Sequence, residues 1–471
     1  MGLNTIREAQ VASGRAAGQN ETPCPPQQRN LVSPPNRPNI VLITTHDTGR
    51  HFGCYGVPTV RTPRIDGLAA EGVRFTNHFT TTPVCSASRA TMLTGRYPQS
   101  HGLLHLIHPP CDWRLNPGER HLSHVLRGAG YHTSLHCFQH EAPLEDLGFD
   151  EWHTRWYDDK PYPDNMPTAD QAADGFAAFL AARRDRERPF YAQIGFNETH
   201  VPFRFGGVEP DGTHGVYIPP YLVDNEASRA HFAPLQGAIH VVDRAVGTIL
   251  DALSAAGLAQ DTITIFTTDH GIEAPRSKWF LYDPGIETAF LLRWPGGGIE
   301  AGQTCDQLTC HIDVFPTILE LAGLPALGNV QGRSLAGALA DANAPTVHDE
   351  VFGYYQPKEL RSVRTRTHKL IRNFHEAREL VVPVDMTRPG THGGRLPFAQ
   401  LFDLQSDPNE FENLADRPDY AEVLEDLDGR LSRWMESVDD PILHGPTPTP
   451  YYEDAIEHYR RSRPARSATQ R

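Results

Sequence analysis

Short apolar runs alternate with segments of helical spacing along most of this chain. The run at residues 39–45 is apolar and β-branched, which is typical of a strand buried on both faces. Similar runs predict further strands at residues 131–137, 190–196, 262–268 and 288–293. Apolar or alanine-rich positions at helical spacing predict helices at residues 172–186, 235–255 and 311–322. Strands that alternate with helices predict an α/β fold, with a mostly parallel central sheet flanked by helices and functional side chains at the carboxyl ends of its strands.

The pattern changes beyond about residue 345. Residues 361–373 alternate polar and apolar positions like the strands of a hairpin, and a terminal helix is predicted near residues 420–437. These segments predict a small C-terminal α+β subdomain with an antiparallel sheet and a helix. The expected organisation is a flexible N-terminal extension at 1–37, a domain with the candidate catalytic residues at 38–345, the subdomain at 346–445 and a loop-like or disordered tail at 446–471.

Composition and charge narrow the classes of function. The chain has 471 residues, of which 39% are hydrophobic and 21% charged, enough for a substantial core. Its formal net charge of −15 argues against nucleic-acid binding, so an anionic substrate would need a local cationic pocket. No apolar run of membrane-spanning length and no apolar leader core occur in the sequence, so we expect no membrane association. Seven cysteines without framework spacing indicate free thiols in a reducing compartment, and we expect a cytoplasmic protein.

The most informative segment is residues 85–96, Cys-Ser-Ala-Ser-Arg-Ala-Thr-Met-Leu-Thr-Gly-Arg. Helical spacing puts Arg89 on the same face as Cys85, four residues earlier. A cation so placed, together with a helix N-terminus, would favour negative charge at position 85. The segment therefore predicts an activated nucleophile beside an anion site, against the simpler interpretation of a buried structural cysteine.

Two polar pairs follow predicted strands and indicate a metal site. His46-Asp47 comes directly after the first strand, and Asp269-His270 follows the strand at residues 262–268. Loops at the ends of parallel strands can bring both pairs together with an oxygen nucleophile, which makes a plausible site for a divalent cation. An Asp-His-Gly sequence alone would be an ordinary turn, so the metal prediction depends on its combination with the Cys85 segment.

Residues 85–96 resemble the signature of type I sulfatases, Cys-x-(Pro/Ala)-x-Arg followed by Leu-Thr-Gly-Arg. In that family the cysteine is oxidised to formylglycine, whose hydrated aldehyde is the nucleophile, so the resemblance implies a maturase that acts on Cys85. Ala87 stands where the aerobic maturation system prefers proline, whereas radical-type maturases accept alanine. The resemblance covers residues 38–443 and is closest to the heparan N-sulfatase (N-sulfoglucosamine sulfohydrolase) branch, through the residues at 269–275 and 281–285. It implies the alkaline-phosphatase/sulfatase-like fold.

The resemblance also implies a ligand set for one divalent metal ion. Asp47 and Asp269 match family ligands, His270 stands where the family uses Asn, and His46 replaces an Asp. With position 85 as the nucleophile, the expected metal-binding residues are His46, Asp47, Cys85, Asp269 and His270. We expect Ca²⁺ first by resemblance, although two imidazoles would shift the site towards Mn²⁺ or another transition metal.

The remaining catalytic residues are implied in the same way. His140 matches the histidine of a Gly-Lys-x-His segment whose lysine is replaced here by Phe138. His200 lies in a Phe-x-x-x-His-x-Pro segment, near the expected leaving group, and Lys278 falls where the family has a basic residue on the sulfate. The expected catalytic set is Cys85, Arg89, His140, His200 and Lys278, with His200 or Lys278 as the proton donor and His140 as the base.

The sequence thus predicts a sulfatase that hydrolyses a sulfate ester or sulfamate, and a sulfated sugar is the expected substrate. It is compatible with an oligomer. One alternative is a phosphonate monoester or phosphodiester hydrolase on the same scaffold, favoured by His270 and the missing lysine. A second alternative is a non-catalytic binding protein that descends from a sulfatase. The intact Cys85, Arg89 and Lys278 favour an active enzyme.

Overall fold

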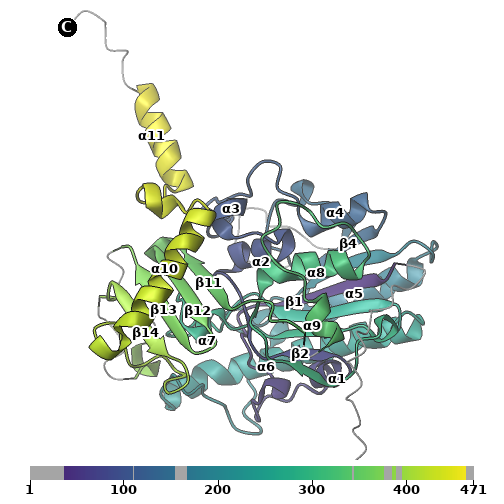
Figure 1. Cartoon of the computed structure of the whole chain (residues 1–471). Coiled ribbons are helices and arrows are strands. Elements are labelled where there is room, and N and C mark those ends of the chain that lie inside the picture. The colour runs from purple at the N-terminus through teal and green to yellow at the C-terminus, as the bar shows by residue number, and fades with distance from the viewer. Residues whose placement is uncertain are drawn as a thin grey trace, which may run out of the picture.

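An eight-stranded sheet forms the centre of the computed structural model (Figure 1). The structure describes residues 37–109, 111–153, 167–341, 344–375, 384–388 and 395–462. The strand order is β5-β4-β6-β1-β7-β8-β2-β9. These strands are β1 (Asn39–Thr45), β2 (Val73–Phe75), β4 (His132–Cys137), β5 (Glu151–His153), β6 (Phe190–Gly195), β7 (Thr262–Thr268), β8 (Phe290–Arg293) and β9 (Gln303–Cys305). The short strands β3 (His78–Phe79) and β10 (Thr309–Cys310) pair separately.

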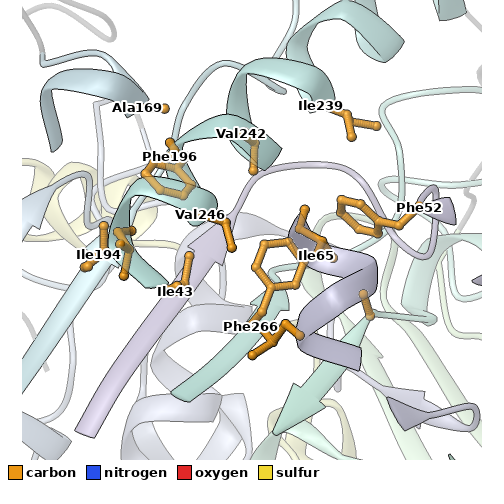
Figure 2. Close-up of a cluster of buried hydrophobic side chains, with 14 of the residues drawn as sticks. Ile43, Phe52, Ile65, Ala169, Ile194, Phe196, Ile239, Val242, Val246 and Phe266 are labelled. Atoms are coloured by element: carbon orange, nitrogen blue, oxygen red, sulfur yellow. The ribbon is translucent and has the colours of Figure 1, made fainter. Parts of the chain in front are cut away.

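The central strand β1 is buried on both faces because helices cover the sheet on either side. Val41 and Ile43 point into one apolar cluster, and Ile40 and Leu42 into another. The first cluster, drawn in part in Figure 2, packs against α1 (Pro63–Ala70), α5 (Ala169–Ala182) and α6 (Glu226–Ala255). The second packs against α4 (Leu122–Gly128), α8 (Val314–Leu321) and α9 (Ala336–Ala340). The predicted α/β class with helices on both faces is confirmed.

The sheet is parallel from β5 to β7 and changes direction at β8. The strands β5, β4, β6, β1 and β7 pair in parallel, whereas β8 pairs antiparallel with both β7 and β2. The segment between β7 and β8 contains no long crossover helix, only the short α7 (Asp283–Ile286), so β8 returns beside β7 in the opposite direction. The sequence pattern therefore located this strand but could not give its direction.

The helix positions differ from the predicted ones at their ends. The helix α5 begins at Ala169 because Thr168 and Gln171 form a capping box, and it ends before the extended Arg183. The helix α6 begins at Glu226, where Asn225 caps it, and continues through an internal proline to Ala255. The segment predicted at 311–322 is a helical turn followed by α8.

The predicted C-terminal antiparallel sheet and helix are present. A four-stranded sheet in the order β11-β12-β13-β14 is formed by β11 (Glu350–Tyr355), β12 (Leu360–Thr365), β13 (His368–Asn373) and β14 (Ala399–Asp403). The helix α10 (Ala421–Ser437) packs against it (Figure 1). The domain boundaries proposed from the sequence remain predictions, and the expected extension lies outside the described residues except at Arg37.

The expectation of a loop-like tail after residue 446 is wrong for its first part. Residues Pro450–Ser462 form the helix α11, which projects away from the body of the molecule in Figure 1. A proline at its first position and a following polar run with helix-forming residues favour this helix. Among the residues that the structure describes, no helix is long and apolar enough to cross a membrane.

Candidate active site

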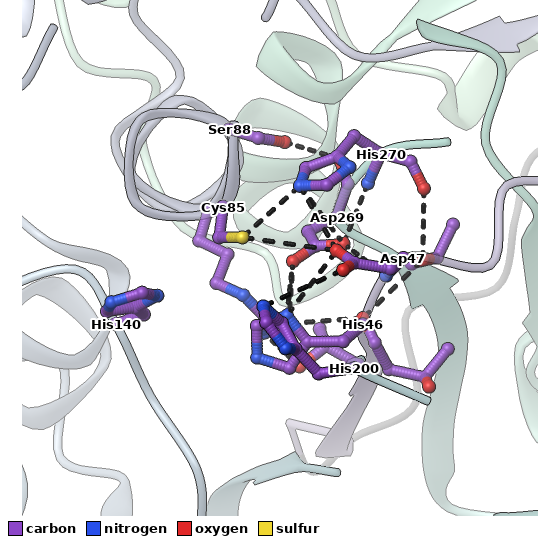
Figure 3. A network of polar contacts seen from close by, with 12 residues as sticks. His46, Asp47, Cys85, Ser88, His140, His200, Asp269 and His270 are labelled. Atoms are coloured by element: carbon purple, nitrogen blue, oxygen red, sulfur yellow. Dashed lines mark hydrogen bonds and ion pairs between the residues drawn. The ribbon is translucent and has the colours of Figure 1, made fainter. Parts of the chain in front are cut away.

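The candidate site lies at the carboxyl ends of β1 and β7, where the sequence placed it. These strands are parallel neighbours with Thr45 opposite Thr268, so His46-Asp47 and Asp269-His270 leave the sheet side by side. The helix α2 (Cys85–Thr94) begins beside them with Cys85 as its first residue (Figure 3). The left-handed Gly95 ends this helix, and its N–H bonds to the Thr91 carbonyl.

Asp269 joins the two polar pairs and the arginine of α2. Its Oδ1 accepts hydrogen bonds from the backbone N–H groups of Asp47 (3.0 Å) and His270 (2.9 Å). Its Oδ2 lies 3.1 Å from Arg89 and 2.9 Å from His46 Nδ1. Burial opposes ionisation, but the neighbouring His270 ring and the Arg89 guanidinium outweigh it and hold the pKa of this carboxyl well below its usual range. Asp269 is therefore an anion at neutral pH.

Asp47 faces the opposite side of the same centre. Its backbone has a φ of 48°, a left-handed conformation that is strained for a residue with a side chain. Its Oδ2 accepts from Lys278 Nζ at 2.8 Å, and its Oδ1 lies 3.3 Å from His270 Nε2. Although burial opposes ionisation, the charge of Lys278 lowers the pKa of this carboxyl far enough to keep it ionised.

Cys85 is almost fully buried, and its Sγ points at His270. The His270 Nδ1 lies 2.9 Å from the Gly271 carbonyl, which can only accept, so Nδ1 carries the proton and Nε2 has a lone pair. That Nε2 lies 3.2 Å from Cys85 Sγ, and the thiol can donate to it. Burial raises the pKa of the Cys85 thiol well above its usual value, with Lys278 opposing the shift. The charge of Arg89 favours the thiolate, as expected, but burial outweighs it.

Lys278 connects Asp47 to the more open side of the site. Its Nζ lies 2.8 Å from Asp47 Oδ2, 2.8 Å from Glu273 Oε2 and 3.4 Å from His200 Nε2. Burial works against its charge, but Asp47 outweighs burial and raises its pKa well above the usual value. His200 is neutral, because burial and the charge of Lys278 lower its pKa to about 3. The Glu273 side chain is 32% exposed and marks the side from which solvent reaches this group.

Sequence reasoning missed Glu273 as a member of the site. It lies four residues after Asp269 and five before Lys278, within the segment 269–275, which the sequence analysis uses only as part of the resemblance to heparan N-sulfatase. Its carboxylate joins Asp47 and His200 in a second group of potential metal-binding atoms. An acidic residue close to two site residues was the available signal, but only the loop conformation brings it to the Lys278 ammonium.

The remaining side of the site is formed by Arg89, Phe138 and two histidines, His46 and His140. The Arg89 guanidinium lies 5.2 Å from the Phe138 ring centroid, and its nitrogens donate to Thr44 and to the Thr45 carbonyl. The rings of His46 and Phe138 meet edge to face, 4.3 Å between centroids. His140 lies farther out, 6.4 Å from the His46 ring, and stands apart from the carboxylates in Figure 3. Burial lowers the pKa of His140 well below its usual value, so it is neutral.

The loop that carries Lys278 is held by a close backbone approach and by the C-terminal subdomain. A side chain on Gly271 would come within 1.8 Å of the Pro284 carbonyl oxygen, so only glycine fits there. Arg276 donates to the Glu410 carbonyl at 2.6 Å and stacks on the Tyr282 ring at 4.0 Å. The loop position therefore depends on contacts across the subdomain boundary.

The donor atoms present fit a divalent cation. One donor atom each from His46, Asp47, Cys85 and Asp269 lie within 4.8 Å of one another, and all four residues are buried. His270 Nε2 presents a lone pair to the same space, 3.2 Å from Cys85 Sγ. Two ionised carboxylates and imidazole lone pairs are ligands of a divalent metal. The five residues expected to bind metal are thus brought together around one centre.

A buried nucleophile position, two carboxylates and two cations at the ends of parallel strands define a site for metal-assisted hydrolysis of an anionic group. The chain matches the sulfatase family model over residues 38–324, and the model for the C-terminal part of N-sulphoglucosamine sulphohydrolase over residues 273–387. The chain belongs to the sulfatase family, whose members hydrolyse sulfuric ester bonds.

Relatives and solved structures agree with this membership. The chain is 29% identical to an ulvan-active sulfatase of Formosa agariphila, in an alignment that covers 86% of this chain and 76% of the relative. It is 28% identical to human N-sulphoglucosamine sulphohydrolase, in an alignment that covers 87% of this chain and 92% of the relative. The structure of BT4656 in complex with its substrate D-glucosamine-2-N,6-O-disulfate has the same fold, with a TM-score of 0.67 and 19% identity over 86% of this chain and 99% of that one.

Proposed function

We propose that this sulfatase hydrolyses the sulfate ester or sulfamate of a sulfated sugar, with the side chain of Cys85, converted to formylglycine, as nucleophile. The observation that supports it most is the environment of Cys85. Its Sγ points into the cluster of metal-binding atoms, where a nucleophile would lie beside the bound ion. A hydrated aldehyde at this position would have two hydroxyl groups, so that one could attack sulfur and the other, once deprotonated, could expel sulfate and restore the aldehyde. An unmodified thiol has no second hydroxyl for that last step.

The metal would be bound by His46, Asp47, Asp269 and His270 together with position 85. Once bound, the ion would act as a Lewis acid on the sulfate oxygens and the hydrated aldehyde would supply the attacking oxygen. Ca²⁺ is our first expectation by family membership, and the imidazoles of His46 and His270 support Mn²⁺ or another transition metal as the alternative.

The chain's own residues would orient the sulfate and move the proton. Arg89 and Lys278 are the two buried cations beside Cys85, and both carry their charge next to an ionised carboxylate. Lys278 Nζ holds the proton that the leaving atom needs, since His200 Nδ1 bonds to the Val201 carbonyl and its Nε2 faces Lys278. His200 therefore orients Lys278, and His140, which is neutral at the far wall, is the base of the second step.

The sugar substrate is supported by the named relatives. One relative is named for N-sulphoglucosamine and another for ulvan, and the fold neighbour was solved with a disulfated glucosamine. A cytoplasmic location stays a prediction, which fractionation of the native host would test.

The first experiment is the mass of the tryptic peptide at residues 75–89, from protein made in its native host or with a radical-type maturase. We expect the mass of the aldehyde at Cys85. An unmodified cysteine in a host with a working maturase would refute the formylglycine proposal.

A second experiment separates sulfate from phosphorus esters. Matured protein, Cys85→Ala and Lys278→Ala are compared on 4-nitrophenyl sulfate and on a phenylphosphonate monoester. We expect the matured wild-type protein to hydrolyse the sulfate ester. Each substitution should abolish this turnover or reduce it by at least about 100-fold, because losing one preorganised charge contact has an effect of that size. Faster turnover of the phosphonate by wild-type protein would replace the proposed function with the phosphonate hydrolase.

A further inference from the structure

Three aromatic rings from distant segments meet beside Lys278. His105 follows the short helix α3 (Pro98–His101), Trp279 follows Lys278 directly, and Tyr355 ends β11. The Trp279 ring lies 5.7 Å from His105 and 6.2 Å from Tyr355, and His105 lies 6.2 Å from Tyr355, all between centroids. We name these three residues the aromatic wall.

The aromatic wall lies beside Lys278, which the proposed function makes the proton donor to the leaving group. Lys278 Nζ lies 5.0 Å from the Trp279 ring centroid, while the same atom bonds to Asp47 and approaches His200. The charge of Lys278 also contributes, after burial, to lowering the pKa of His105 to about 4. A group attached to the sulfate and departing towards Lys278 would therefore meet the Trp279 ring.

Trp279 is held in a conformation that favours glycine. Its φ is 74°, in the left-handed region, which is strained for a bulky side chain. Its N–H donates to the Pro83 carbonyl at 3.2 Å, and its own carbonyl accepts from Lys358 Nζ at 3.4 Å. These contacts fix the backbone next to Cys85 and leave the indole half-buried, whereas Tyr355 behind it is only 4% exposed.

The same corner offers a polar partner. The Glu273 carboxylate lies 2.8 Å from Lys278 Nζ, and its side chain is 32% exposed. An indole face stabilises the C–H face of a ring, and a neighbouring carboxylate accepts hydrogen bonds from hydroxyl or amine groups. A pyranose presents both kinds of surface, whereas a simple aryl group presents only the first.

We propose that the aromatic wall and Glu273 form the leaving-group subsite, and that Trp279 determines specificity by stacking on the pyranose ring that carries the sulfate. This inference rests on the proposed sulfatase activity towards sugars and adds the residues that recognise the sugar. The strained backbone of Trp279 is then explained, because the residue that follows Lys278 must place its ring beside the leaving group.

The test compares substrates with and without a ring. Matured wild-type protein, Trp279→Ala and Trp279→Gly are assayed on glucose 6-sulfate, glucosamine 6-sulfate, glucosamine N-sulfate, 4-nitrophenyl sulfate and ethyl sulfate. We expect kcat/KM for the best sugar sulfate to fall by about tenfold or more in both variants, and kcat/KM for ethyl sulfate to change less than about twofold. Glycine accepts the left-handed backbone, so Trp279→Gly keeps the test valid if Trp279→Ala folds poorly. The control variant Phe398→Ala removes an exposed aromatic ring outside the aromatic wall and should change kcat/KM for neither the sugar sulfate nor ethyl sulfate.

Each other outcome has a defined meaning. An equal loss on sugar sulfates and on ethyl sulfate would give Trp279 a structural role only and overturn the inference. A wild-type preference for 4-nitrophenyl sulfate that depends on Trp279, with no preference for sugars, would overturn the pyranose assignment. Absence of turnover on every sulfate would instead refute the proposed function itself.

Discussion

His46 and Phe138 occupy two of the positions at which this chain departs from the sulfatase pattern, which has an aspartate at the first and a lysine at the second. Both side chains are buried, and their rings meet edge to face with 4.3 Å between centroids. The sequence treats the two departures as independent, but the contact shows that one negative and one positive charge are missing from the same place. We therefore predict that the two replacements are energetically coupled.

The structure gives the size of the effect. Phe138→Lys alone puts an ammonium near Arg89, whose guanidinium lies 5.2 Å from the phenylalanine ring centroid. At an effective dielectric constant of about 20, like charges roughly 5 Å apart repel by about 3 kcal/mol. His46→Asp alone adds a buried carboxylate close to Asp269, at a cost of about 3–5 kcal/mol without a partner charge. In the double variant the new charges face each other at roughly 4 Å and attract by about 4 kcal/mol at that dielectric constant.

The assay is a double-mutant cycle on the free energy of unfolding by urea, for wild-type protein, both single variants and the double variant. The cycle is measured once with chelator and once with a saturating divalent cation, because the metal also compensates the new carboxylate. With chelator we expect a favourable coupling energy of about 3 kcal/mol between the two substitutions. Additive effects, within about 0.5 kcal/mol, would refute the reasoning.

Three further predictions concern the metal, the loop and the interface between the subdomains. His270→Asn replaces an imidazole by an amide oxygen, so calorimetric titration should show Ca²⁺ affinity rising relative to Mn²⁺, and unchanged relative affinities would exclude His270 as the selecting ligand. Gly271→Ala brings a methyl group within 1.8 Å of a backbone carbonyl oxygen and should lower the free energy of unfolding by about 1–3 kcal/mol, whereas Gly128→Ala, with open space around it, should not. Burial raises the pKa of Glu410 from 4.5 to about 7, so between these pH values the folded protein holds a proton that the unfolded chain releases. The free energy of unfolding should therefore fall as the pH rises from 4.5 to about 7. Glu410→Gln should flatten that slope in pH-dependent melting curves, and the more exposed Glu412→Gln should leave it unchanged.

The local pattern predicted much of the fold and of the site. Five strands of the central sheet, the C-terminal hairpin strands and four helices were located, because a buried strand is a short apolar run and a helix has its own spacing. The ends of α5 and α6 were misplaced, since the capping side chains Thr168 and Asn225 lie outside the apolar pattern. The helix α11 was missed because most of its residues are polar.

The sequence by itself determined which chemical groups this protein has and at which strand ends they stand. The signature that starts at Cys85 and the pairs that contain Asp47 and Asp269 are short-range features, so they can be read without a structure. Only the tertiary structure decided how those groups act on one another. The raised pKa of the Cys85 thiol, the Glu273–Lys278 contact and the aromatic wall depend on burial and on distances between residues far apart in the chain. Such quantities arise from packing across elements, and no local pattern encodes them.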